Sequence, residues 1–186
     1  MKKLSFLFYI LSLVIVSCGS DNEPATIVDQ HNQIFNSFMS EQNVINQIPA
    51  TLATGIDAPF YLIDSQRQIY MKVISDNGVK LTERQECYFR HSTYRLVQSE
   101  NGVKPVLSST NENEMGEQPG ELSYTTLSDI PTLLPLRYVG NCSEIYLAIR
   151  QISDKSDAPM LMHIRYFPNM GGKTKRAMLS ERSEVG

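Results

Sequence analysis

The sequence has no tryptophan and only three cysteines among its 186 residues. It also has no excess of basic residues, because 17 Lys and Arg stand against 20 Asp and Glu and the net charge is −3 at pH 7. A mildly acidic chain without a basic cluster favours neither nucleic acid nor anionic lipid as an electrostatic partner, so we expect no nucleic-acid binding. Beyond the first residues, the chain has no apolar run long enough to cross a bilayer as a helix.

The N-terminus has the features of a secretory signal peptide. Two lysines precede an apolar stretch over residues 4–16, which is shorter than the roughly 20 residues of a membrane-spanning helix. The motif Val-Ile-Val-Ser-Cys that ends at Cys18 resembles the bacterial lipobox, in which the cysteine takes a diacylglycerol and becomes the mature N-terminus. We therefore expect a lipoprotein signal peptide over residues 1–17, lipid attachment at Cys18 and a lipidated tether over residues 18–24. The alternative is an ordinary cysteine in a cleaved signal or a membrane anchor.

The lipobox resemblance implies that the protein lies in the cell envelope and meets the membrane through its lipid anchor, as an outer membrane lipoprotein. Asp21 and Glu23 resemble the export tag that some Bacteroidetes-type lipoproteins use to reach the cell surface. A solvated tether explains these residues equally well, so the periplasmic and the surface-exposed face both stay open.

Hydrophobic spacing predicts one helix followed by strands. Ile27, Ile34, Phe38 and Ile45 form an apolar stripe, which predicts a helix over residues 24–47 that packs on a sheet, although Pro49 disfavours helix near the end of this range. Alternation, β-branched residues and turn signals predict strands within residues 60–63, 69–74, 86–98, 103–107, 122–127, 143–152 and 160–167.

The segments between these strands are assigned by composition. Residues 127–136 predict a short helix or turn, capped by Ser128 or Asp129, and residues 108–120 predict a mobile polar loop. Pro105 restricts its strand to a sheet edge. One helix followed by hairpin-connected strands predicts an α+β domain with a mainly antiparallel sheet over residues 25–168. We expect the tail over residues 169–186 to be poorly ordered.

The stretch from Tyr70 to Ser109 resembles the first half of FKBP-type peptidyl-prolyl isomerase domains. It contains a strand that ends in a turn with Gly78, a hydrophobic strand, the turn Asn101-Gly102 and the paired serines Ser108-Ser109. Leu134–Gly140 stands where the active-site helix and its following loop would be. Residues 25–168 are also similar to uncharacterised FKBP-like lipoproteins of gut Bacteroidetes, which share a leading helix, a Tyr-Met strand, a Pro-Leu-x-Tyr segment and a closing Tyr-Phe strand. This resemblance implies a curved sheet, a leading N-terminal helix and a short helix before the last two strands.

The resemblance also implies a damaged isomerase site. The family's pocket has a tryptophan floor and an aspartate wall, whereas this chain has no tryptophan and has Val106-Leu107 in place of the usual Phe-Asp pair. Tyr94 is the one candidate for a pocket aromatic. We therefore expect a non-catalytic binding or assembly module for an unknown protein or peptide. The alternatives are an active periplasmic peptidyl-prolyl cis-trans isomerase or chaperone and, more weakly, a surface glycan-binding accessory.

The sequence contains no motif for a zinc site, a serine nucleophile or a phosphate-binding loop. His91 and His163 lie in predicted strands that could be neighbours, with Cys87 as the one nearby soft ligand, but the spacing matches no zinc motif and His31 is remote in sequence. There is no Gly-x-Ser-x-Gly elbow and no phosphate-binding loop, because Gly171-Gly-Lys-Thr lacks the required spacing. We predict no metal, no cofactor and no catalytic residue.

Cys87 and Cys142 remain after the lipidated cysteine. Beyond the inner membrane they could form a disulfide, although both fit equally well as small core residues.

Overall fold

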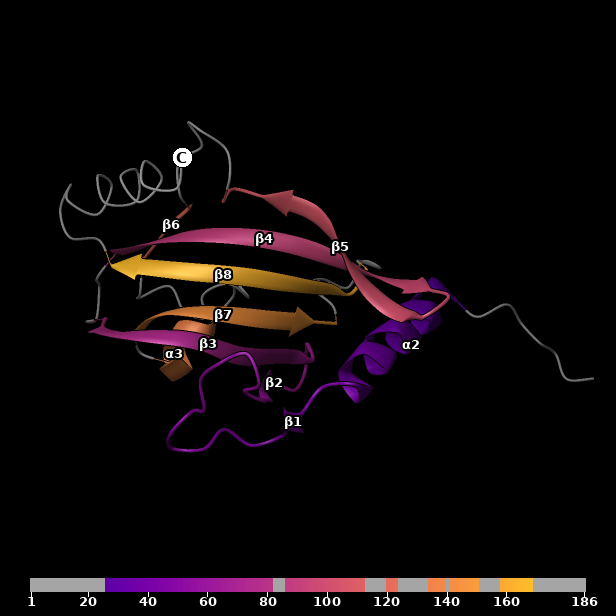
Figure 1. Cartoon of the computed structure of the whole chain (residues 1–186), viewed down its shortest axis with the longest axis horizontal. Coiled ribbons are helices and arrows are strands. Elements are labelled where there is room, and N and C mark those ends of the chain that lie inside the picture. The colour runs from indigo at the N-terminus through magenta and orange to yellow at the C-terminus, as the bar shows by residue number, and fades with distance from the viewer. Residues whose placement is uncertain are drawn as a thin grey trace, which may run out of the picture.

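The computed structural model describes residues 26–81, 86–112, 120–123, 134–139, 141–150 and 158–168. These ranges contain two helices and eight strands (Figure 1). In chain order the elements are α2 Ile27–Ser40, β1 Val44–Ile45, β2 Phe60–Asp64, β3 Ile69–Lys80, β4 Glu86–Ser99, β5 Gly102–Thr110, β6 Gly120–Ser123, α3 Leu134–Val139, β7 Asn141–Ile149 and β8 Met160–Pro168.

The strands form a single curved sheet in the order β1-β2-β3-β7-β8-β4-β5, and β6 pairs with β4 beside β5. Every pairing is antiparallel except that of β1 with β2. The last two strands lie in the middle of the sheet, between β3 and β4 (Figure 1). The predicted α+β class, with a mainly antiparallel sheet, a leading helix and a short helix before the last two strands, is confirmed.

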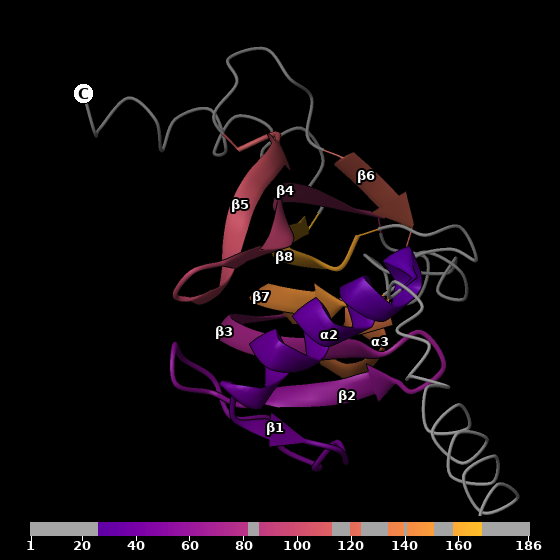
Figure 2. The ribbon, with the colours of Figure 1, turned by 90° about the vertical axis from the view of Figure 1, so that its right-hand side faces the viewer.

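The helix α2 crosses one face of the sheet (Figure 2). It begins with a capping box, in which Asp29 N donates to Thr26 Oγ1 and the Asp29 carboxylate accepts from Thr26 N. It buries Phe35, Phe38 and Met39 against side chains from β2, β4, β5, β7 and β8. The predicted packing of the helix on a sheet is therefore confirmed. Ile27, at the start of the predicted stripe, is exposed.

The helix α3 covers the opposite face. Its residues Leu134 and Leu136 pack in the larger core cluster, with alternate residues of β3, β7 and β8. The resemblance placed a helix at this segment, and the structure has one there. The strand alternation predicted for residues 160–167 is also confirmed, because Ile164 and Tyr166 face α3 whereas Leu161 faces α2.

The helix prediction was wrong at its end. The structure ends α2 at Ser40, and Val44–Ile45 form a short parallel strand on β2. Asn43 O accepts a hydrogen bond from Phe60 N at 2.8 Å, so tertiary pairing takes the backbone that the helix would have used.

The strand β3 is longer than predicted, because the Asp-Asn-Gly sequence at residues 76–78 does not end it. The chain passes through a register irregularity instead, with Gly78 at a φ of 72° and Gly78 N donating to Asp76 Oδ1 at 2.9 Å. A turn signal in the sequence therefore forms a bulge, and the bulge fixes the direction of the Asp76 side chain.

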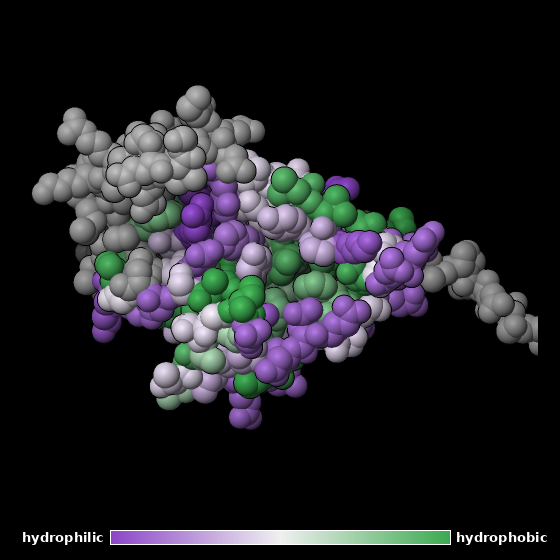
Figure 3. All heavy atoms as spheres, viewed as in Figure 1, coloured by the Kyte–Doolittle hydropathy of each residue, from purple (hydrophilic) through white to green (hydrophobic). Residues whose placement is uncertain are grey.

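The strand β5 lies at the edge of the sheet, as Pro105 predicted. It continues to Thr110, so the loop predicted from residue 108 begins later. Val106 and Leu107 are about half exposed, at 52% and 55%, and give the apolar surface over β5 in Figure 3. The predicted caps at Ser128 and Asp129, the signal peptide, the tether and the tail all lie outside the described residues.

Candidate functional site

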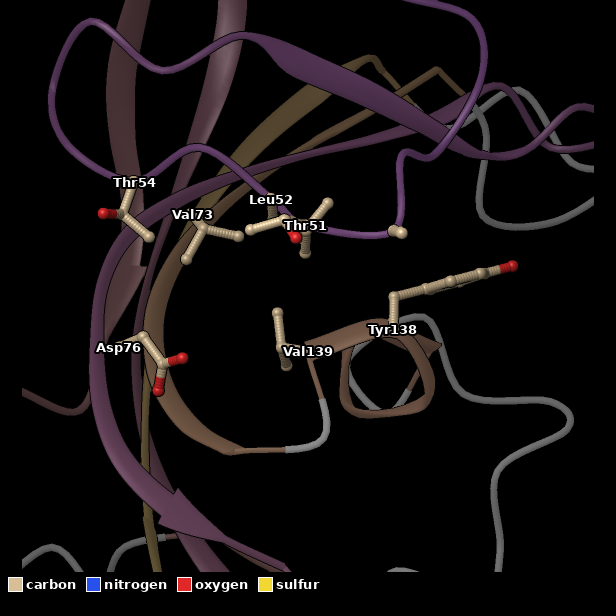
Figure 4. Close-up of a pocket in the computed structure, with 8 residues that line it drawn as sticks. Thr51, Leu52, Thr54, Val73, Asp76, Tyr138 and Val139 are labelled. Carbon is tan, nitrogen blue, oxygen red and sulfur yellow. The ribbon is translucent and has the colours of Figure 1, made fainter.

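A recess of about 210 Å³ lies between α3, residues 50–54 and the end of β3, and we call it the α3 recess (Figure 4). Its lining comes from three separate parts of the chain. The lining residues are Ala50, Thr51, Leu52, Thr54, Val73, Asp76, Tyr138 and Val139.

Backbone contacts hold residues 50–54 against the sheet. Thr54 forms an isolated parallel bridge with Val73, and Gly55 N donates to Val73 O at 3.1 Å. Gly55 has a φ of 118°, which favours glycine at this position. The segment 50–54 is thus pinned at the point where it forms one wall.

Two tyrosine hydroxyls brace the walls from outside. Tyr138 Oη donates to Ile63 O at 2.9 Å, which ties α3 to β2. Tyr61 Oη accepts from Ala53 N at 3.0 Å, which ties the wall loop to the same strand. The Tyr138 bond joins residues 75 apart in sequence and the Tyr61 bond fixes the wall loop, so the α3 recess is a preformed feature of the fold.

Asp76 is the charged residue of the lining. Its Oδ1 accepts from Gly78 N and its Oδ2 accepts from Asn141 Nδ2, both at 2.9 Å. Figure 4 shows the carboxylate at one wall, opposite the side of the recess on which Tyr138 lies. The acid is therefore held in place by the bulge of β3 and by the start of β7.

The lining residues can hold a small group, and histidine, cysteine and lysine are not among them. Leu52, Val73 and Val139 supply apolar walls, and the threonine hydroxyls and Asp76 supply polar contacts. This mixture is typical of a binding site with a few fixed polar groups.

The positions singled out by the FKBP resemblance do not meet at the α3 recess. Val106 and Leu107 lie on the edge strand β5, and Tyr94 packs partly buried on the α2 face. Of the segments that carry the resemblance, α3 and the strand β3, through Val73 and Asp76, contribute to the lining. The sequence analysis missed the other lining residues because they meet only through tertiary pairing.

A second group of polar residues lies on the α2 face, and we call it the His163 cluster: His163, Glu112, Glu144, Tyr146 and Arg165. His163 Nδ1 lies 3.1 Å from Glu112 Oε1, and His163 Nε2 lies 2.7 Å from Glu144 Oε1. The imidazole stacks on Tyr146, with ring centroids 4.8 Å apart. Arg165 Nη2 lies 3.7 Å from Glu112 Oε2. The cluster therefore ties β7 and β8 to the end of β5.

Burial raises the pKa of Tyr146, and the nearby Tyr94, Glu144 and Glu112 raise it further. The two carboxylates that contact His163 therefore also act on Tyr146. No sequence motif points to the cluster, because the two glutamates that contact His163, Glu112 and Glu144, lie 51 and 19 residues before it.

The prediction that His91 and His163 lie on neighbouring strands is confirmed, because β4 and β8 pair. His91 is opposite Ile164, however, whereas His163 is opposite Ser92, so the two imidazoles point to different faces of the sheet. Within the described ranges, no three His, Cys, Asp or Glu side chains are arranged to hold a metal ion.

Cys87 is a fully buried free thiol, and burial raises its pKa to about 11. Its strand β4 and the strand of Cys142, β7, pair with opposite sides of β8. Strands two steps apart are separated by about 9–10 Å, whereas the Cα atoms of a disulfide lie within about 7 Å. This arrangement disfavours the bridge that the sequence allowed between the two cysteines.

Cys18 lies outside the described residues, so lipid attachment stays a prediction. In the part of the chain that the structure describes, neither helix is long and apolar enough to span a membrane.

No protein-family model matches the chain, and no characterised protein matches it in sequence. Among solved structures, the fold is similar to a DUF4827 family protein from Parabacteroides distasonis, with a TM-score of 0.51, 14% identity, and coverage of 77% of this chain and 95% of that chain. A weaker match is the N-terminal domain of FKBP42 from Arabidopsis thaliana, with a TM-score of 0.36, 12% identity, and coverage of 66% and 96%. At 14% identity, the similarity to the DUF4827 family protein is evidence for a shared fold and for nothing further.

Proposed function

We propose that this chain is a lipid-anchored, non-catalytic binding module that holds a peptide or protein segment at the outer membrane. The observation that carries the proposal is the α3 recess, whose lining has apolar walls and one acid already engaged in two structural hydrogen bonds. Such a site can bind a small group through apolar contacts and a few fixed polar groups. The lipobox-like residues before Cys18 support the anchor.

The competing function is prolyl isomerisation, and refolding kinetics separate the two. Uncatalysed prolyl isomerisation takes roughly tens of seconds at 25 °C, so micromolar enzyme would shorten the slow phase of a proline-limited refolding reaction. We expect the soluble domain, residues 21–186, to leave this phase unchanged. Acceleration that is lost on filling the α3 recess, for example in Thr54→Trp, would refute the non-catalytic function.

The Thr54→Trp variant also tests where binding occurs. Thr54 is exposed at the recess, so a larger side chain there should fill the space without entering the core. Asn101→Trp, at the exposed tip of the β4–β5 hairpin, is the matched control. A peptide ligand found by selection should lose affinity for the first variant and keep it for the second.

A further inference from the structure

The lining of the α3 recess contains one charged side chain, and its charge is negative. Asp76 is charged, and the other lining residues are neutral. The ion pairs found among the described residues join Arg67 to Asp64, His163 to Glu112 and Glu144, and Arg165 to Glu112, so none of them neutralises Asp76. The Asp76 carboxylate therefore presents a negative charge at one wall of the recess, without an ion-pair partner among the described residues.

The Asp76 carboxylate is also preorganised. Its two hydrogen bonds, from Gly78 N and Asn141 Nδ2, use one acceptor site on each oxygen. A carboxylate has about four such sites, so further donors can bind without displacing either partner. Because the Asp76 carboxylate is already held in place, a cation or N–H donor that binds it would lose little free energy to ordering of this side chain.

The size of the recess restricts the apolar part of a ligand. Its volume of about 210 Å³ is below the roughly 300–1,000 Å³ of sites that enclose a whole small molecule. Leu52, Val73 and Val139 form its apolar walls. This space suits one small aliphatic side chain, while the rest of the ligand stays outside.

We infer that the α3 recess takes a small aliphatic side chain of an extended peptide whose neighbouring residue is lysine or arginine, with the cation at Asp76. This specificity rests on the proposed binding function and narrows it to basic peptide segments. The Asp76 contact is exposed, so its effect on affinity is modest, about two- to five-fold, and weakens as salt rises.

Three blocked tetrapeptides, Ala-Val-Lys-Ala, Ala-Val-Gln-Ala and Ala-Val-Glu-Ala, test the inference by titration into the ¹⁵N-labelled soluble domain. The amide signals of Thr54, Val73 and Val139 report on the recess. We expect affinity in the order lysine, glutamine, glutamate, with a two- to five-fold step between the first two. Asp76→Asn should remove that step, whereas Asp57→Asn, which changes an exposed acid outside the lining, should keep it.

The outcomes distinguish the proposed binding site at the α3 recess from the inferred preference for a basic residue. Equal affinity for the lysine and glutamine peptides, with shifts at the recess, would overturn the charge preference and leave the binding site standing. Shifts confined to other parts of the domain, or no shifts with any peptide, would overturn both the preference and the assignment of the binding site to the α3 recess. Retention of the lysine preference in Asp76→Asn would also refute the role of this acid.

Discussion

The burial of Cys87 on β4 has two measurable consequences, one for the reactivity of its thiol and one for the stability of the domain at high pH. Its position on β4, on the other side of β8 from β7, separates it from Cys142. We predict that the soluble domain, unfolded without reductant, shows both thiols free, and that Cys87 resists alkylation in the folded state because it is buried. Thiol counting with mass spectrometry measures this, and a linked pair would contradict the arrangement.

The Cys87 thiol also lowers the free energy of unfolding of the domain as the pH rises above 9. Folding raises the pKa of Cys87 from an ordinary 9.0 to about 11, so above pH 9 the unfolded chain releases a proton that the folded chain keeps. This contribution is present in full below pH 9 and is lost as pH rises to about 11, by roughly 1–3 kcal/mol.

Denaturant unfolding at several pH values measures the effect. Cys87→Ala should be less stable overall, but its stability should decline less steeply between pH 9 and 11. Identical slopes for the variant and the parent would rule out this residue as the cause.

At the scale of elements, the sequence predicted most helices and strands because their periodicity is local. The alternation on β4 and β8 reflects which face of each strand is buried, and the structure confirms it. Of the predicted stripe, Phe38 is buried on α2, whereas Ile27 is exposed and Ile45 lies outside the helix. Val44–Ile45 were lost from the helix because their partner, β2, lies some 15 residues further on. Pairing of that kind leaves no local signal.

The candidate sites could not be predicted for the same reason. Thr54, Val73 and Tyr138 meet only after β3 and α3 have taken their places, and the FKBP resemblance covered these two elements without predicting that they meet residues 50–54. His163 was visible in the sequence as one of three histidines, but its contacts with Glu112 and Glu144 depend on the pairing of β4, β7 and β8. The Asp-Asn-Gly turn signal was misassigned because a bulge and a turn share the same residues.

The capping box of α2 gives an element-scale prediction. Thr26→Ala removes the acceptor of the Asp29 amide and should lower the free energy of unfolding by about 1 kcal/mol. Ser37→Ala, at an exposed position in the last turn of the same helix, is the control and should change it by less than about 0.5 kcal/mol. Equal effects of the two substitutions in urea unfolding would show that the cap is unimportant.

The His163 cluster gives a second prediction at this scale. A double-mutant cycle with His163→Gln and Glu144→Gln should yield a coupling energy of about 0.5–3 kcal/mol, because the ring nitrogen and the carboxylate oxygen lie 2.7 Å apart across β7 and β8. The cycle of His91→Gln with Glu144→Gln should yield a value near zero, since His91 faces the other side of the sheet. Equal couplings in urea unfolding would contradict the assigned contact.

At the scale of the whole molecule, the proposed function joins a short lipid-modified N-terminus to one α+β domain. We predict that the full-length precursor, made in a bacterium, incorporates labelled palmitate and fractionates with membranes, and that Cys18→Ser abolishes both because the acceptor thiol is removed. Labelling and membrane fractionation that persist in Cys18→Ser would refute attachment at this residue.

The most direct test of the central claim is site-specific photo-crosslinking of the full-length protein in cells. A photoreactive phenylalanine analogue replaces either Thr54, at the α3 recess, or Asn101, at the β4–β5 hairpin. The binding function predicts a defined crosslinked segment at position 54, mapped by mass spectrometry to a small aliphatic residue beside a basic one, and none at position 101. Crosslinks of equal yield at both positions, or none at position 54, would contradict it.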